Sequence, residues 1–153
     1  MKVKDLMSTD VRTCTPETTV AEGARLMREA DCGMLPVVDG GELVGVVTDR
    51  DICIALSTQD ARASHLRVGA IARTNVATCA PEDDIKAALT SMTQARVRRL
   101  PVVGFGRAVM GVLSMSDILR AVEPEGGTLE DRVIETLQAI CGHHRAPSHI
   151  IAA

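Results

Sequence analysis

Apolar side chains recur along the first third of the chain at helical spacing and then in two short β-branched runs. Spacings of four and three predict a helix capped by Thr19. The apolar stripe of this helix consists of Val20, Ala24 and Met27. The runs 34–38 and 43–48, separated by a glycine turn at 39–41, predict a hairpin. With a strand before the first helix and a second helix from about Arg50, this segment is predicted as strand, helix, strand, strand, helix.

The same pattern returns 65 residues later, so the chain contains an internal repeat. Leu35-Pro36-Val37-Val38 falls on Leu100-Pro101-Val102-Val103, and after one inserted residue Asp51 falls on Asp117. A unit of about 60 residues buries little surface alone, so we expect the two units to pack sheet to sheet around a shared core. Such a two-fold-like pair would create two equivalent clefts between the repeats.

The predicted fold class is therefore α/β (α+β), with two β-α-β-β-α repeats packed as a pseudo-two-fold pair plus a C-terminal helix. We place the first repeat at residues 1–60, a linker and the second repeat at 61–125, and the C-terminal helix and tail at 126–153. The C-terminal helix is expected over 128–141 and resembles neither repeat. One of its faces carries Val133, Leu137 and Ile140.

Composition narrows the classes of function. The 153 residues carry a net charge of −3 and a single aromatic side chain, Phe105, so no nucleic-acid partner is expected. No apolar stretch approaches the roughly 20 residues that span a bilayer, and the N-terminus lacks the apolar core of a secretory signal. Five cysteines without a CxxC pair are typical of reduced thiols. These features predict a soluble cytoplasmic protein without a membrane partner.

The sharpest chemical signal is repeated where the last strand of each unit meets the last helix. Thr48 is followed three positions later by Asp51, and Ser114 by Asp117. Backbone N–H groups at a helix start favour an anion such as phosphate, and the hydroxyl adds one donor. The carboxylate accepts two hydrogen bonds from a vicinal diol, so the combination suits a sugar phosphate. The same spacing is also that of an ordinary capping box, and from the residues alone both interpretations stay open.

With Met7-Ser8-Thr9 at the start and the two Leu-Pro-Val-Val runs, these motifs make the chain resemble a tandem pair of CBS domains, also called a Bateman module. The resemblance covers about four fifths of the chain. It implies a non-catalytic regulatory module that binds adenosine-containing ligands in clefts between the repeats. The ligands expected for such a module are AMP, ADP, ATP or S-adenosylmethionine, and no further cofactor is implied.

When the binding positions of the family are transferred to the matching residues of this sequence, the resemblance implies that residues of both repeats form each cleft. In one cleft Asp117 would hold ribose, and Ser114 and Ser116 would lie near phosphate. The base would lie against residues of the first repeat, namely Ser8, Val11, Thr13, Cys32, Gly33 and Met34. The other cleft would use Asp51, Thr48 and Arg50 together with Val76, Thr78, Val97 and Arg98.

The two clefts are not expected to be equivalent. We align Met7-Ser8 with Ile71-Ala72, so the second cleft lacks one polar contact. Arg50, Arg98 and Arg99 supply positive charge to it, although Arg98 and Arg99 are alternatively solvated charges at a strand edge. Our hypothesis is that the Asp51 cleft prefers a polyphosphate and the Asp117 cleft a less charged adenosyl ligand.

The remaining expectations concern catalysis, assembly and metals. No nucleophile or general base stands in a cleft, so the chain is not expected to be an enzyme. A homodimer is expected, with a regulated protein as a further partner. The alternative function is a ligand-free scaffold that binds a partner protein. Cys141, His143 and His144 are either metal ligands or part of a polar tail.

Overall fold

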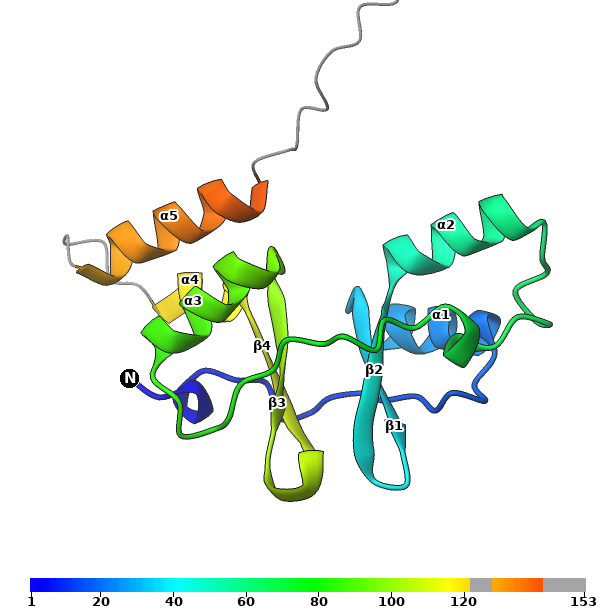
Figure 1. Cartoon of the computed structure of the whole chain (residues 1–153), viewed down its shortest axis with the longest axis horizontal. Helices are drawn as coiled ribbons and strands as arrows, with labels where there is room; N and C mark the ends of the chain where they lie inside the picture. Colours follow the sequence, from blue (N-terminus) through cyan, green and yellow to red (C-terminus); the bar gives the residue numbers. More distant parts are fainter. Residues whose placement is uncertain (122–127, 142–153) are drawn as a thin grey trace, which may run out of the picture.

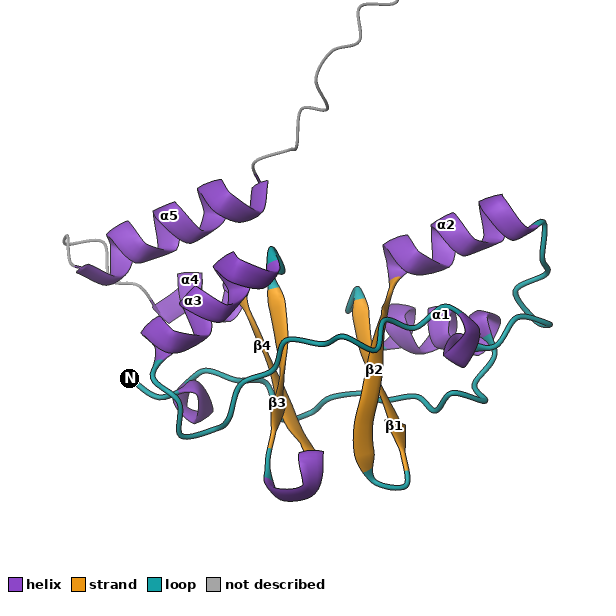
Figure 2. Cartoon of the chain, in the orientation of Figure 1, coloured by secondary structure: helices purple, strands orange, loops and turns teal. Residues whose placement is uncertain are grey.

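The computed structural model of the chain describes residues 1–121 and 128–141, and these form two similar halves that lie side by side (Figure 1). The first half contains, in order, η1 (Val3–Asp5), α1 (Val20–Glu29), β1 (Met34–Asp39), β2 (Glu42–Thr48) and α2 (Asp49–Gln59). The second contains η2 (Val68–Ala70), α3 (Ile85–Ala95), β3 (Arg99–Val103), η3 (Phe105–Arg107), β4 (Val109–Ser114) and α4 (Met115–Ala121). A last helix, α5 (Thr128–Cys141), follows. Figure 2 shows the two hairpins next to each other and the helices of each half beyond them.

Each half is built on one antiparallel hairpin, as the sequence pattern predicts. Met34 pairs with Thr48 in the first hairpin, and Arg99 pairs with Ser114 in the second. Both hairpins shift register at equivalent positions, after Val37 and after Val102. The predicted pseudo-two-fold arrangement of repeats is therefore confirmed down to matching irregularities in the strands.

The strand expected at the start of each unit differs from the prediction, because it is reduced to a single bridging residue. Cys14 bridges Val37, and the equivalent Cys79 bridges Val102. The chain turns away directly afterwards, since the Thr15 N–H is taken by the Thr18 hydroxyl and Pro16 has no N–H to offer a ladder. The chain therefore offers no backbone N–H for a further hydrogen bond to the hairpin after the bridging residue.

The segment that begins each half packs on the other half. The Val3 N–H donates to the carbonyl of Asp83 at 2.9 Å, and Ser8 exchanges two backbone hydrogen bonds with Val112, each 3.0 Å long. In the same way Arg73 exchanges two backbone bonds with Val46, at 3.0 and 2.9 Å. Figure 1 shows the N-terminal segment lying along the second half and the segment that contains η2 lying beside the first half. These crossings connect the halves by main chain.

The buried apolar side chains form two clusters, where the sequence led us to expect one shared core. The cluster of the first half includes Leu35, Val37 and Val47, and that of the second includes Leu100 and Leu113. Val3 belongs to the second cluster, which follows from the exchange of segments. Each hairpin is covered by helices of its own half, so the surfaces between the halves remain available for the cavities described below.

Helix α5 completes the core of the second half. Val133 is buried in the second cluster, and Leu137 and Ile140 pack against it, as the predicted apolar face requires. At the polar edge of the contact, Arg132 donates to the hydroxyl of Thr90 in α3 at 2.7 Å. The helix resembles neither repeat in sequence, and in the fold its apolar face packs on the second half. Within the described ranges, no helix is long and apolar enough to cross a membrane.

Candidate functional site

Each hairpin leads directly into a helix through the same hydrogen-bonded junction. The backbone N–H and the hydroxyl of Thr48 donate to Asp51 Oδ2 at 3.1 and 2.7 Å, and the Asp51 N–H donates back to the Thr48 hydroxyl at 3.1 Å. Ser114 and Asp117 repeat this pattern at 2.8, 2.6 and 3.2 Å. The capping-box interpretation of the two motifs therefore holds for both aspartates. It occupies Oδ2 and leaves Oδ1 for other partners.

The second carboxylate oxygen of each aspartate accepts from an arginine. Arg73 donates twice to Asp51 Oδ1, and Arg120 donates to Asp117 Oδ1. Burial by itself raises the pKa of Asp51, but the hydrogen bonds from Arg73 and Thr48 outweigh it and hold that pKa below its ordinary value. Asp51 is therefore a carboxylate at neutral pH, with an arginine that an incoming ligand would have to displace or share.

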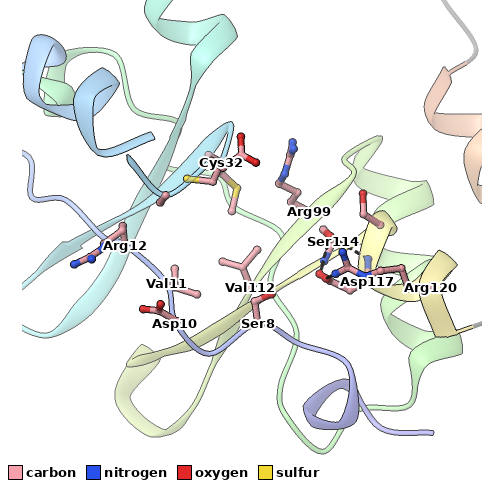
Figure 3. A pocket seen from close by; sticks show the side chains of 14 residues that line it. Ser8, Asp10, Val11, Arg12, Cys32, Arg99, Val112, Ser114, Asp117 and Arg120 are labelled. Carbon is pink, nitrogen blue, oxygen red and sulfur yellow. Dashed lines mark hydrogen bonds and ion pairs between the residues drawn. The ribbon is translucent and has the colours of Figure 1, made fainter. Parts of the chain in front are cut away.

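A cavity of about 280 Å³ lies between the halves beside Asp117. Figure 3 shows Asp117, Arg120 and Ser114 on one side of it and Cys32 with Val11 and Arg12 on the other. Of the residues expected here, the cavity brings together Ser8, Val11, Cys32, Met34, Ser114, Ser116 and Asp117. Thr13 and Gly33, which were also expected, do not line it.

A second cavity, of about 490 Å³, lies between the halves beside Thr48. Of the residues expected in this cleft, the cavity brings together Thr48, Arg50, Val76, Val97 and Arg98. Asp51 and Thr78 do not line it, whereas Gly33 does. Arg73, which does line the cavity, donates two hydrogen bonds to the Asp51 carboxylate and lies between it and the cavity. The carboxylate expected to bind ribose is thus covered in this cleft, while Asp117 is a wall residue of the other.

The two cavities are built from equivalent positions of the repeats. Val11, Ala30 and Cys32 of the smaller correspond to Val76, Ala95 and Val97 of the larger, at the offset of 65. The structure shifts our alignment of Met7-Ser8 with Ile71-Ala72 by one residue. Ser8 corresponds to Arg73, because Ser8 bridges Val112 where Arg73 bridges Val46. If the offset of 65 had been extended back to Ser8, it would have identified Arg73 from the sequence.

Several lining residues escaped the sequence analysis. In the smaller cavity these are Asp10, Arg12, Ala30, Asp31, Arg99, Val112 and Arg120, and in the larger Gly33, Met34, Val46, Asp49, Arg73, Asn75, Ala77, Ala95, Arg96 and Pro101, while Arg99 lines the larger cavity as expected. Arg73 follows from applying the repeat offset to the assigned residue Ser8, whereas most of the others form pairs of equivalent positions that were both missed. Arg120 belongs to no such pair, since its equivalent in the first repeat is Ile54, which lines neither cavity.

The charges that line the two cavities differ strongly. The smaller cavity is lined by three arginines and three aspartates, so its formal charges balance. The larger is lined by five arginines and one aspartate. Much of this difference comes from exchanges at equivalent positions, where Ser8, Asp31 and Ser116 are replaced by Arg73, Arg96 and Arg50. An anionic ligand is therefore favoured electrostatically in the larger cavity.

The candidate metal ligands of the tail give no further site. His143, His144 and the side chain of Cys141 lie outside the described part of the chain. In the described part, no group of three or more His, Cys, Asp or Glu side chains is placed to hold a metal ion.

Comparison with known proteins gives consistent matches. The family model "CBS domain" matches residues 3–58 and 68–124. CBS domain-containing protein YhcV of Bacillus subtilis is 35% identical over 116 residues, which are 76% of this chain and 81% of that protein. Among solved structures, the CBS domain pair of protein MJ0100 in complex with 5′-methylthioadenosine and S-adenosyl-L-methionine is similar, with a TM-score of 0.72, 28% identity, and coverage of 79% of this chain and 94% of that chain. CBSX2 in complex with AMP has a TM-score of 0.68 and 26% identity, with coverage of 78% and 94%.

Proposed function

The chain belongs to the CBS-domain family, with two modules in tandem, and from that premise we propose that it is a regulatory protein that binds adenosine-containing ligands between the modules. The observation that carries the proposal is the pair of cavities built from equivalent positions, each at the junction of a strand with a helix start. The similar CBS pairs that were solved with S-adenosyl-L-methionine, 5′-methylthioadenosine and AMP support this ligand class.

In the smaller cavity, we assign Asp117 to the ribose. Its Oδ1 would accept from the diol alongside or in place of Arg120, and the Ser114 and Ser116 hydroxyls would face phosphate or another polar substituent. The base would lie between the apolar parts of Val11 and Met34, since no aromatic side chain lines the cavity.

In the larger cavity, Arg73 changes the expected roles. Asp51 would reach a ribose only when the guanidinium of Arg73 turns towards the ligand, and an anionic phosphate would favour that turn. Thr48, Arg50 and Arg98 line the same cavity and would bind phosphate oxygens. The hypothesis of a polyphosphate here and a less charged adenosyl ligand beside Asp117 is thus supported by five arginines against three.

The proposed output is conformational rather than catalytic. A ligand that contacts both halves favours the arrangement of the halves that binds it best, in proportion to its difference in affinity between arrangements. We propose that a homodimer in the cytoplasm transmits this change to a regulated protein partner. The alternative is a scaffold with empty cavities that binds its partner regardless of ligand.

Native mass spectrometry tests the proposal, because it counts ligands and subunits together. We expect a dimer that holds one or two ligands per chain when AMP, ATP, S-adenosylmethionine or NAD is added separately. Asp117→Ala and Asp51→Ala should each reduce the count. Asp84→Ala is the matched control, since Asp84 also caps a helix, with its side chain accepting from the Lys86 N–H, but neither lines a cavity nor, unlike Asp51, holds a residue that does. A protein that stays empty with all four compounds would favour the scaffold.

A further inference from the structure

Two residues line both cavities, and they occupy the same position in the two repeats. Met34 is the first residue of β1 and Arg99 the first residue of β3, 65 positions later. In a pair related by a pseudo-two-fold axis, a residue beside the axis faces both sites, so its repeat equivalent does too. The wall between the cavities is therefore one buried thioether and one exposed guanidinium.

Arg99 is placed to serve an anion on either side. Figure 3 shows it at the rim of the smaller cavity, between Cys32 of the first half and Ser114 of the second. One of its terminal nitrogens is 3.7 Å from the point where a Cβ on Gly33 would lie, and Gly33 lines the larger cavity. No side-chain hydrogen bond or ion pair holds the Arg99 guanidinium within residues 1–121 and 128–141, in contrast to Arg73 and Arg120.

We propose that Arg99 couples the two cavities, so that an anionic nucleotide in one weakens the binding of an anionic nucleotide in the other. A guanidinium that makes a bidentate contact with one phosphate group is turned away from the other cavity. The wall that the two cavities share then presents only the uncharged side chain of Met34 to the second ligand. This inference rests on the proposed function, because it takes both cavities as nucleotide sites, and adds that their occupancies are linked.

The smaller cavity depends on Arg99 more than the larger one does. Its other two arginines stand among three aspartates, whereas the larger cavity retains four other arginines. When the larger cavity fills first, the smaller loses a third of its positive side chains. Linkage is reciprocal, so the factor is the same whichever cavity fills first, and couplings of this kind are typically about 5- to 150-fold.

The test isolates each cavity with a matched pair of substitutions. Ala30 and Ala95 are exposed, equivalent residues at the ends of α1 and α3, and each lines one cavity only. Ala30→Trp should fill the smaller cavity and Ala95→Trp the larger, and native mass spectrometry should find one ATP per chain in each. Calorimetric titration with ATP then gives one dissociation constant for each cavity alone.

The unblocked protein gives two stepwise dissociation constants for ATP. The coupling ratio is their product divided by the product of the two single-site constants, and a value above 1 means that each ligand weakens the other. We expect a ratio of about 10, within the range typical of coupled sites. Arg99→Gln should weaken ATP binding in both blocked variants and bring the ratio to within twofold of 1. Arg98→Gln is the control, because Arg98 lines only the larger cavity. It should weaken binding in the Ala30→Trp variant alone and leave the ratio unchanged.

The possible failures are distinguishable. ATP binding to none of the proteins would overturn the proposed nucleotide sites, and the coupling with them. One ATP in only one of the two blocked variants would overturn the coupling, since a single site has nothing to couple. Two ATP per chain with a ratio within twofold of 1 would overturn the coupling and leave the proposed function standing.

Discussion

Arg73 binds Asp51 through two hydrogen bonds to one oxygen, from Nε at 2.9 Å and from a terminal nitrogen at 2.7 Å. The pair joins the crossing segment of the second half to the first turn of α2 in the first half. The other half has no counterpart, because Ser8 stands where Arg73 would be. One ion pair therefore contributes both to the contact between the halves and to the shape of the larger cavity.

We expect Arg73→Met to lower the free energy of unfolding at pH 7 by about 0.5–1 kcal/mol, a discounted value because Arg73 is exposed and screened by solvent. Asp51 has a lowered folded-state pKa, so its contribution is present above the unfolded pKa of about 3.9 and is lost as the pH falls through the folded value. The deficit of the variant, measured by urea denaturation, should shrink between pH 7 and pH 3. A deficit of constant size would mean that Arg73 acts through packing alone.

Two equivalent glycines permit the main-chain crossings. A Cβ on Gly111 would lie 2.6 Å from the Ser8 carbonyl oxygen, and one on Gly45 would lie 2.9 Å from that of Arg73. Because backbone atoms cannot yield as side chains do, Gly111→Ala and Gly45→Ala should each cost about 1–3 kcal/mol of stability. Gly23→Ala is the control, since its Cβ would meet a Val68 methyl at an ordinary 3.5 Å within helix α1. Thermal denaturation should find this variant as stable as the parent or more so.

The neighbours Val133 and Ile134 test the role of α5. Val133 is 3% exposed in the core of the second half, whereas Ile134 is 54% exposed. Val133→Ala should lower the free energy of unfolding by about 1–3 kcal/mol, and Ile134→Ala by less than about 0.5 kcal/mol. Chemical denaturation checks both. Equal effects would show that α5 is not docked as described.

The cysteines should differ sharply towards a thiol reagent. Burial raises the pKa of Cys14 to about 11, and burial with a smaller contribution from Asp83 raises that of Cys79 to about 12. At pH 7.5 both should react only on unfolding, because the thiolate is the reactive form. Cys53 is exposed and should react quickly.

Cys32 offers a reporter of ligand binding, because it is partly exposed and lines the smaller cavity. Saturation with an adenosyl ligand should slow alkylation of Cys32, measured by peptide mass mapping, and leave Cys53 unaffected. Equal rates with and without ligand, in a protein shown to bind it, would place the ligand elsewhere.

The extent of prediction from sequence follows the range of the interactions. Hairpins, caps and the apolar face of α5 depend on residues a few positions apart, so local patterns located them closely. The pairing of Ser8 with Val112 and of Arg73 with Val46 joins distant segments, and no local pattern specifies it. The expectation of one shared core was wrong for the same reason, since the exchanged segments close each half separately. Among the site residues assigned as repeat equivalents, Val11 with Val76 and Cys32 with Val97 line the cavities, whereas Thr13 and Thr78 do not.

The exchange of segments also has a consequence for how the protein is made. Val3 is among the first residues to leave the ribosome, but other members of its core cluster, such as Ile85, Leu100 and Leu113, are translated much later. The first repeat likewise lacks the Arg73 strand contact until the chain has passed into the second. A nascent chain halted after the first repeat would hold an unpaired β2 edge and an N-terminal segment without its binding surface. Folding to completion therefore waits for nearly the whole polypeptide, and release of the two halves as separately stable fragments is not expected.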